Sequence, residues 1–300
     1  MKDTPALDLR REDTAAWRTL ADYVALAKPR LNVLVVATSA AGYYLGATGP
    51  LNFGAMAAAV AGTAFVAGGA ATLNQLYERE TDALMRRTRM RPLPDGRVAP
   101  ADARLFGVVL STIGLVMLAS LAGWLATLLA FGTLTIYLGV YTPFKRRSPM
   151  ATLVGAVPGA LPPLIGWAAS RGNVDVGGLS LFLIVFLWQI PHFMAIAWMY
   201  RDDYRLAGFP MLPVIESDGR RTGRQAVTYA AALLPASLVP TLAGVSGNVY
   251  AVVAAALGAG LLLLAIRFSS TRSDAAARRL FFGSLIYLPL IWIVMIADKL

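Results

Sequence analysis

The sequence contains no cysteine and only one histidine among its 300 residues. Without cysteine, the chain cannot form disulfides, thiolate metal sites, cysteine-ligated iron–sulfur clusters or a cysteine nucleophile. One histidine argues against a histidine-rich metal site or a bis-histidine haem site. Charge is also scarce, because 15% of the residues are charged, against about 25% in soluble domains, while 57% are hydrophobic. With a mean hydropathy of +0.60, the chain is predicted to be an integral membrane protein.

The apolar residues occur in long blocks and do not alternate with polar ones, which predicts helices and argues against a β-barrel. A membrane-spanning helix needs roughly 20 apolar residues. Nine segments qualify, at about 31–47, 53–73, 103–121, 124–141, 150–169, 179–199, 225–244, 249–267 and 280–297. The predicted fold class is an all-α integral membrane protein with nine transmembrane helices. Residues 1–28 are expected to form a polar cytoplasmic tail without a signal peptide, and residues 29–300 a single transmembrane domain.

Charge is distributed unevenly between the two sides of this nine-span topology. One side carries 25 of the 27 basic and 15 of the 17 acidic residues, and only Arg171, Lys299, Asp175 and Asp298 lie on the other. By the positive-inside rule, the basic side and the N-terminus are predicted to be cytoplasmic. Topology and attraction to anionic lipid account for most of these basic residues. No acidic residue lies in the middle of a span, which disfavours an ion-coupled transporter or proton pump and places any chemistry at the cytoplasmic mouth.

Three oxygen-bearing side chains follow the second span at helical spacing. Asn74, Glu78 and Asp82 are four residues apart. No glycine or proline intervenes before Pro92, so the helix is expected to continue and to place them in one stripe. Two carboxylates at this spacing repel each other by roughly 0.2–0.5 kcal/mol, which favours a cation between them. Oxygen ligands with incomplete coordination suit Mg²⁺, which is typically bound by one or two carboxylates and the phosphates of a substrate.

A cluster of arginines directly follows this stripe, at Arg86, Arg87, Arg89 and Arg91. Guanidinium groups bind phosphate oxygens in a forked geometry. Acids that hold Mg²⁺ beside such a cluster therefore predict a diphosphate site. The alternative is a solvated helix end, in which Glu78 and Asp82 form ordinary ion pairs with neighbouring arginines such as Arg86. Both interpretations are open for this loop alone.

A second acidic pair, Asp202 and Asp203, follows the sixth span on the same side. Acids are unfavourable at the C-terminal end of a helix dipole, so their placement there favours a bound cation. Two acidic clusters that face one cavity could hold two Mg²⁺ ions. Lys145, in the basic loop after the fourth span, could bring a further cation to this mouth, although topology accounts for at least two of the three basic residues of that loop.

The single histidine lies in the apolar sixth span, directly after Pro191. Polar groups within a membrane are costly and are usually retained for function, so His192 is a candidate for contact with a substrate. The alternative is a buried histidine that hydrogen bonds to a carbonyl freed by the proline.

Six stretches of the sequence carry a family resemblance. They are Ala27–Arg30, Asn74–Asp82 with Met85–Thr88 and Arg91–Pro92, Tyr141–Arg146, Gly159–Trp167, Pro191–Phe193 and Asp202–Pro213. Together they resemble the UbiA superfamily of membrane prenyltransferases, and specifically its protohaem IX farnesyltransferase (haem O synthase) branch, over nearly the whole chain. There are two departures. Glu78 stands where aspartate is common in the family, and the second motif has adjacent aspartates where the wider superfamily has a spaced pair.

The resemblance implies a nine-helix bundle around a central cavity open to lipid. It implies a catalytic site in which metal is bound by Asn74, Glu78, Asp82, Asp202 and Asp203. Which of the two adjacent aspartates binds metal stays open. The residues expected to bind substrate are Arg86, Arg91, Lys145, Tyr141, His192 and Tyr204. The implied substrates are farnesyl diphosphate and haem b, the implied cofactor is Mg²⁺, and the implied products are haem O and diphosphate.

The resemblance also implies a multi-pass protein in the lipid bilayer of a bacterial inner membrane, with no nucleic-acid partner. The next haem-modifying enzyme or a terminal oxidase assembly is the expected protein partner. Two other functions compete with this one. The first is a UbiA-type prenyltransferase with an aromatic quinone-precursor acceptor, because acceptor choice depends on the shape of the cavity. The second is a non-catalytic haem or lipid transporter or an oxidase assembly factor, which would not need two acidic clusters on the same side.

Overall fold

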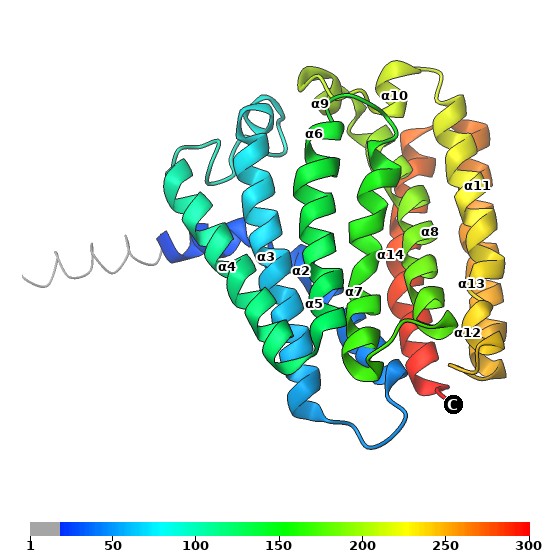
Figure 1. Cartoon of the computed structure of the whole chain (residues 1–300). Coiled ribbons are helices and arrows are strands. Elements are labelled where there is room, and N and C mark those ends of the chain that lie inside the picture. The colour runs from blue at the N-terminus through cyan, green and yellow to red at the C-terminus, as the bar shows by residue number, and fades with distance from the viewer. Residues whose placement is uncertain (1–18) are drawn as a thin grey trace, which may run out of the picture.

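The computed structural model describes residues 19–300, which form a bundle of helices (Figure 1). The first 18 residues of the expected tail lie outside this range. The elements are, in chain order, α2 (Pro29–Gly46), α3 (Phe53–Leu84), α4 (Pro100–Leu121), α5 (Trp124–Thr135), the π-helical η1 (Ile136–Tyr141), α6 (Thr142–Phe144), α7 (Ala151–Arg171), α8 (Val176–Met199), α9 (Arg201–Leu206), α10 (Leu212–Ile215), α11 (Arg220–Ala236), α12 (Val239–Leu242), α13 (Asn248–Thr271) and α14 (Asp274–Ala297). The only β pairing in the described residues is an isolated bridge between Ser246 and Lys299. The predicted all-α class is confirmed.

Eight segments of the described chain are long and apolar enough to cross a membrane. One of them joins α5, η1 and α6, and another joins α11 and α12. A ninth is reached only if helix Thr19–Leu26 and α2, which meet at a bend of 47°, count as one span. The structure thus supports eight or nine membrane helices where nine were predicted. The difference lies in the first span, because α2 qualifies only together with helix Thr19–Leu26 and not by itself.

The described part of the predicted tail is docked against the bundle. Leu26, at the end of helix Thr19–Leu26, is fully buried in a cluster with Leu93 of the loop after α3. The Tyr23 ring packs edge-on against Phe106 of α4, with ring centroids 5.1 Å apart. The segment before the first span therefore packs against α4 and the loop between α3 and α4.

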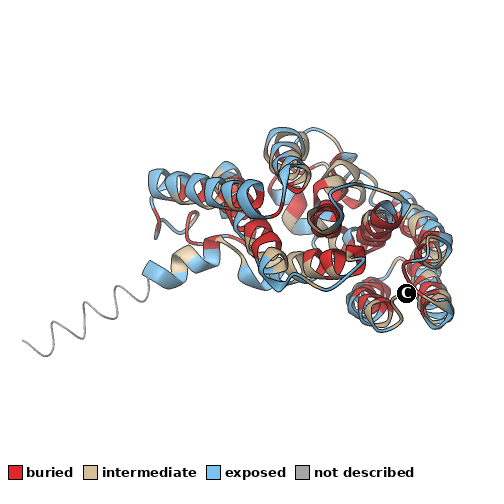
Figure 2. Cartoon of the chain, turned by 60° about the horizontal axis from the view of Figure 1, so that its bottom comes forward, coloured by how far each residue is buried: buried red, intermediate tan, exposed pale blue. Residues whose placement is uncertain are grey.

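Large apolar side chains lie on the outside of the bundle. Trp124, Leu105 and Val252 are 70%, 66% and 71% exposed. In Figure 2, buried residues occupy the helix faces that point toward other helices, and exposed residues occupy the outward faces. An apolar outer surface of this extent indicates contact with lipid.

Two close helix crossings depend on glycine. A Cβ atom on Gly166 of α7 would lie 1.9 Å from the carbonyl oxygen of Ser39 in α2. A Cβ atom on Gly69 of α3 would lie 2.2 Å from Oγ of Ser111 in α4. No side chain fits at these distances, so the backbones approach because the two positions have none. This packing places α3 firmly against α4 on one side of the bundle.

The helix α3 ends at Leu84, earlier than the absence of glycine and proline before Pro92 predicted. Met85 has extended backbone dihedrals, and the hydroxyl of Thr88 donates to the carbonyl of Asp82 at 2.7 Å. Met85 is also buried in a small apolar cluster with residues of the loop after α8. The expectation of a continuous helix was wrong because tertiary packing and a threonine cap end the helix where no local breaker does.

The two ends of the bundle differ in charge. The loop after α3 lies at one end together with α6, α9 and α10, and the C-terminus lies at the other (Figure 1). At the C-terminal end, Nε of Arg171 donates to the carbonyl of Gly46 at 2.8 Å. Nζ of Lys299 donates to the carbonyls of Tyr44 and Ala47 at 2.6 and 2.8 Å. These carbonyls end α2, where cations are favourable, so the two cations outside the basic side have a structural role.

Candidate active site

The three polar residues that follow the second apolar block lie on one face of α3 and are buried. Asn74, Glu78 and Asp82 are 4%, 6% and 1% exposed. Nδ2 of Asn74 donates to Oε2 of Glu78 at 3.3 Å, as the four-residue spacing predicted. We call these three residues the acidic stripe. Buried carboxylates cost free energy unless cations or donors compensate them, so the stripe requires partners from elsewhere in the chain.

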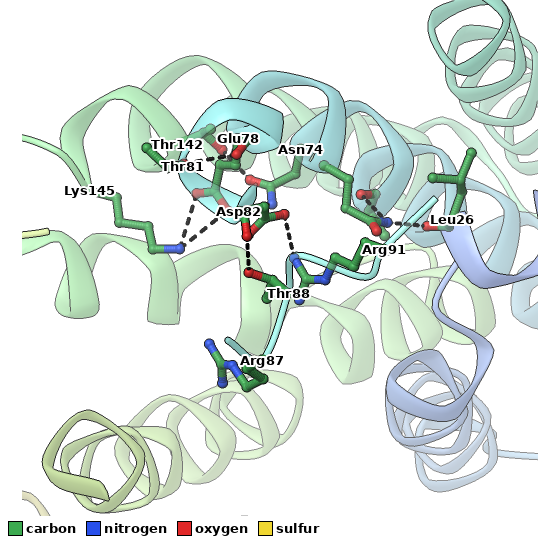
Figure 3. Close-up of polar contacts among 12 residues, drawn as sticks. Leu26, Asn74, Glu78, Thr81, Asp82, Arg87, Thr88, Arg91, Thr142 and Lys145 are labelled. Carbon is green, nitrogen blue, oxygen red and sulfur yellow. Dashed lines mark hydrogen bonds and ion pairs between the residues drawn. The ribbon is translucent and has the colours of Figure 1, made fainter. Parts of the chain in front are cut away.

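Each carboxylate of the stripe has its own cation (Figure 3). Nζ of Lys145 lies 3.1 and 3.3 Å from the two carboxylate oxygens of Glu78. Nη1 of Arg91 lies 2.6 Å from Oδ2 of Asp82. Burial opposes the charge on Lys145, but Tyr141 and the Glu78 carboxylate outweigh it, so the pKa of Lys145 lies above its ordinary value. The solvated helix end with local ion pairs is wrong, because the acids are buried and the partner of Glu78 is 67 residues away.

A π-helical turn, η1, precedes the residues that meet the stripe. Such turns are rare and frequently lie at functional sites. Just beyond it, Oγ1 of Thr142 lies 2.9 Å from Oδ1 of Asn74 and 2.7 Å from the carbonyl oxygen of Tyr137. Tyr141, predicted to bind substrate, stacks on Tyr137 with ring centroids 5.4 Å apart. The hydrogen bond between Thr142 and Asn74 thus holds the end of the fourth span, which Lys145 directly follows, against α3.

One carboxylate oxygen in this cluster lacks a partner. Oδ1 of Asp82 is buried and forms no hydrogen bond with any residue in 19–300. Such an oxygen is costly unless a cation supplies the missing contact. The stripe offers amide and carboxylate oxygens, which is the donor set that Mg²⁺ prefers. Within residues 19–300 no three acidic, histidine or cysteine side chains form a ready-made metal cluster, so the stripe fits an ion whose other ligands are phosphate oxygens or water.

The second acidic pair has no direct contact with the stripe. Asp202 is 76% exposed and pairs with Arg205 at 2.6 Å. Asp203 is half-buried, and its charge acts on Arg87. No hydrogen bond or ion pair in the described chain joins the two acidic clusters.

Arg87, in the loop after α3, contacts the segment that carries the second acidic pair. Its guanidinium lies 4.7 Å from the ring centroid of Tyr200 and 5.7 Å from that of Tyr204, and Nη2 donates to the Tyr204 hydroxyl at 3.4 Å. Arg86, which was predicted to bind substrate, is exposed like Arg87 but forms no hydrogen bond, ion pair or ring contact within residues 19–300. Because α3 ends at Leu84, side chains beyond it do not continue the helical stripe. Helical spacing could not distinguish Arg86 from Arg87 for this reason.

A small apolar cluster lies near Arg87 at this end of the bundle. It consists of Met85, Tyr204, Ala207, Phe209 and Met211. Met85 and Phe209 are each 1% exposed, and Nζ of Lys145 lies 4.6 Å from the Phe209 ring centroid. Neither residue was predicted as part of the site, although both lie in stretches that carry the family resemblance. The only available signal was an apolar residue in each of two otherwise polar loops.

His192 lies between aromatic rings in the interior. Trp188 and Phe281 stack on it at centroid distances of 5.0 and 4.9 Å. Its Nδ1 lies 2.8 Å from Oγ of Ser284, whose hydroxyl donates to the carbonyl of Phe281 at 2.6 Å. Because that proton is already used, Nδ1 donates to the serine, and Nε2 keeps its lone pair. The partner of the histidine is thus a serine and not a carbonyl freed by Pro191.

Fold and site together define a class of protein: a helical membrane protein with a buried acidic stripe at one end, paired with lysine and arginine. The sequence model of the UbiA prenyltransferase family matches residues 35–286 of the chain. The chain therefore belongs to the UbiA prenyltransferase family.

Curated relatives extend over almost the whole chain. Protohaem IX farnesyltransferases from Opitutus terrae and Solibacter usitatus are 46% and 44% identical to it, over 93% of this chain and over 95% and 98% of those proteins. Solved structures share the fold. A digeranylgeranylglyceryl phosphate synthase matches with a TM-score of 0.79 at 16% identity, covering 94% of this chain and 98% of that one. A UbiA homologue from Archaeoglobus fulgidus bound to GPP and Mg²⁺ matches with a TM-score of 0.65 at 18% identity, covering 92% and 99%.

Proposed function

We propose that this chain transfers the farnesyl group of farnesyl diphosphate to a vinyl group of haem b, with addition of water, to give haem O and diphosphate. The observation that carries the proposal is the acidic stripe, in which the buried Oδ1 of Asp82 lacks a donor beside two oriented cations. The curated relatives support the choice of both substrates, since proteins 39–46% identical to this chain are protohaem IX farnesyltransferases.

The stripe residues Asn74, Glu78 and Asp82 would hold Mg²⁺, and Asp203 is the candidate of the second pair. Bound Mg²⁺ neutralises negative charge on the diphosphate. The related Archaeoglobus fulgidus protein, solved with GPP and Mg²⁺, supports this assignment. Asp202 is the weaker candidate, because it is exposed and already paired with Arg205.

The cations of the chain stabilise the leaving group. Lys145 and Arg91 are held by the stripe, so a diphosphate that binds beside it meets two charges that are already oriented. Arg87, held over two tyrosine rings, supplies a third charge from the loop after α3. Positive charge that is fixed before the reaction, at the place where negative charge develops, is usually the largest single contribution to catalysis.

The reaction breaks the bond between C1 of the farnesyl group and a diphosphate oxygen, and the electron pair leaves with the diphosphate. The vinyl group of haem b donates its π electrons to C1 and forms the new carbon–carbon bond. Water then adds to the cation left beside the porphyrin ring and loses a proton, which yields the hydroxyl group. Exclusion of other water from the allylic cation would prevent its premature hydrolysis.

His192 is our candidate for contact with the haem, either at the iron or at a propionate. Its Nε2 lone pair, set by the bond from Nδ1 to Ser284, is suited to bind a metal. Stacking between Trp188 and Phe281 fixes the plane of the ring.

We further place the protein in a bacterial inner membrane with the stripe at its cytoplasmic end. The support is the position of 25 of the 27 basic residues on the side where the stripe lies. A haem-modifying enzyme or a terminal oxidase assembly would receive the apolar product.

The purified protein, supplied with farnesyl diphosphate and Mg²⁺, tests the choice of acceptor. Haem b and 4-hydroxybenzoate are offered separately, and products are identified by mass. Haem O is expected from the first reaction and no prenylated benzoate from the second. Prenylation of the benzoate alone would replace the haem assignment with an aromatic quinone-precursor acceptor.

Asp82→Asn tests the stripe. Turnover should fall by about 100-fold or more, because the carboxylate proposed to bind the metal is removed. Asp95→Asn is the matched control, since Asp95 also pairs with an arginine of this loop, Arg97, but lies outside the stripe. Normal product formation by Asp82→Asn would contradict the metal role of the stripe.

A further inference from the structure

A basic cavity of about 430 Å³ adjoins the acidic stripe on the side of the N-terminal bend. Among residues 19–300, four cations and no acidic residue line it; the cations are Lys28, Arg30, Arg91 and Arg97. Its other walls include the apolar residues Leu31 and Met90. It adjoins the stripe because Arg91, which lines the cavity, pairs with Asp82.

The bend that forms one wall is held from both sides. Nε2 of Gln75 donates to the carbonyl of Leu26 at 2.7 Å, and Nδ2 of Asn32 donates to that of Ala27 at 2.6 Å. Next to them Lys28 has a left-handed backbone with φ of 49°, which costs a non-glycine residue roughly 1–2 kcal/mol. Such strain persists only where the surrounding structure imposes it, and it clusters at functional sites. The fold therefore fixes the direction in which Lys28 leaves the bend.

Two of the four cations are already paired and two are not. Arg91 binds the stripe, and Arg97 binds Asp22 at 3.0 Å. The side chains of Lys28 and Arg30 form no hydrogen bond or ion pair with any other residue in 19–300. The charges that act on Lys28 are those of the stripe and its two cations. The cavity thus offers two unpaired cations within the electrostatic reach of the active site.

We propose that this cavity binds the carboxylate edge of the haem acceptor, with Lys28 and Arg30 each binding one propionate. This inference rests on the proposed function, because it names the part of the acceptor that the chain recognises. Protohaem carries its two propionates on neighbouring pyrrole rings and its two vinyl groups on the other rings. Holding the carboxylate edge in this cavity fixes the orientation in which the porphyrin lies against the stripe.

Two features favour a substrate carboxylate over the phosphate of an anionic lipid. The cavity shares Arg91 with the stripe, so its ligand lies next to the reacting groups. The bend holds Lys28 in one direction, whereas basic residues that attract anionic lipid act as a diffuse surface charge.

The test compares haem b with its dimethyl ester, in which both carboxylates are blocked. The variant Lys28→Asn/Arg30→Gln removes both charges, and asparagine tolerates the left-handed backbone at position 28. Binding of each haem is measured by optical titration of the purified full-length protein, and KM by product formation. Arg147→Gln is the control, because Arg147 is an exposed cation outside the cavity.

The affinity of the double variant for haem b should fall by about tenfold or more, with KM for farnesyl diphosphate within about twofold of the wild type. Affinity for the diester should be the same in both proteins. An equal loss for haem b and the diester would overturn the proposal in favour of a structural effect. A loss seen only in vesicles that contain anionic lipid would assign the cavity to a lipid headgroup. A raised KM for farnesyl diphosphate would assign the two cations to the diphosphate.

The titration also separates this inference from the proposed function. If the wild type binds haem b but makes no haem O, the proposed function fails. The comparison of haem b with its diester still decides whether the cavity binds carboxylates.

Discussion

Nζ of Lys145 lies 3.1 Å from Oε1 of Glu78, although the two residues are 67 positions apart in the sequence. Their side chains are 13% and 6% exposed. A charge that is largely buried is costly without its partner, so each of these residues offsets the cost of burying the other. The pair fastens the fourth span to α3 at the point where the diphosphate is proposed to bind.

Replacement of Lys145 by methionine should lower kcat by about 100-fold, because the leaving diphosphate loses an oriented cation. The same change leaves Glu78 without its cation and should lower the free energy of unfolding by up to roughly 3 kcal/mol. Lys145→Met/Glu78→Gln should regain most of that stability but not the activity. Thermal unfolding in detergent and turnover measure the two effects separately. Arg146→Met removes an exposed cation and should resemble the wild type; an equal loss of turnover there would show that only the charge of the loop matters.

The two adjacent aspartates should differ in their contribution to turnover. Asp203 is half-buried and acts on Arg87, whereas Asp202 is exposed and paired with Arg205. Asp203→Asn is expected to lower kcat by about tenfold or more, with Asp202→Asn within about threefold of wild type, because exposed ion pairs contribute little. The Mg²⁺ dependence of turnover should shift only in Asp203→Asn. The reverse order of effects would assign the metal role to Asp202.

His192→Phe should keep the stacking between Trp188 and Phe281 while removing the Nε2 lone pair. Binding of haem b should weaken by about tenfold, and the optical spectrum of the bound haem should change if Nε2 reaches the iron. KM for farnesyl diphosphate should be unaffected. Ser284→Ala is the companion variant, since it removes the acceptor of the Nδ1 bond, together with the serine's own bond to the Phe281 carbonyl, but keeps the imidazole, and it should cause a smaller change of the same kind. A His192→Phe protein with wild-type haem affinity would reduce His192 to a packing residue.

The acidic stripe could be predicted because its geometry is local. Positions four apart on a helix share a face whatever the rest of the fold does, and Asn74, Glu78 and Asp82 all lie within α3. For Lys145, the sequence predicted only that its charge would lie at the same end of the bundle as the stripe. Its pairing with Glu78 could not be predicted, because it depends on how the fourth span packs against α3. Arg87 was predicted only as one member of the arginine cluster, and its contacts with Tyr200 and Tyr204 could not be predicted because the helix ends before it for tertiary reasons.

The extent of the first span was predicted less well for a similar reason. Hydropathy marks apolar residues, but Lys28 and Pro29 form a bend whose geometry comes from the hydrogen bonds of Gln75 and Asn32. One of those residues lies 49 positions from its partner, beyond the reach of local pattern analysis. Long apolar helices such as α13 and α14, in contrast, need no tertiary information, and their predicted positions lie within the observed elements.

Neighbouring glycines of α3 offer a test of the crossing that holds the stripe. A Cβ atom on Gly69 would lie 2.7 Å from the carbonyl oxygen of Gly107, whereas one on Gly68 would come no closer than 3.5 Å to Ala27. Gly69→Ala should therefore force α3 and α4 apart and lower the free energy of unfolding by about 1–3 kcal/mol. Gly68→Ala should be neutral or slightly stabilising, because alanine favours the helix by roughly 0.5–1 kcal/mol.

Thermal unfolding of both variants in detergent checks this difference. Ser111→Gly, added to Gly69→Ala, should not restore stability, because the backbone oxygen of Gly107 stays in place when the serine side chain is removed. Turnover should fall in Gly69→Ala, since the displaced helix carries Asn74, the first residue of the stripe. If Gly68→Ala and Gly69→Ala unfold at the same temperature, α3 and α4 do not cross as closely as the glycine contacts require.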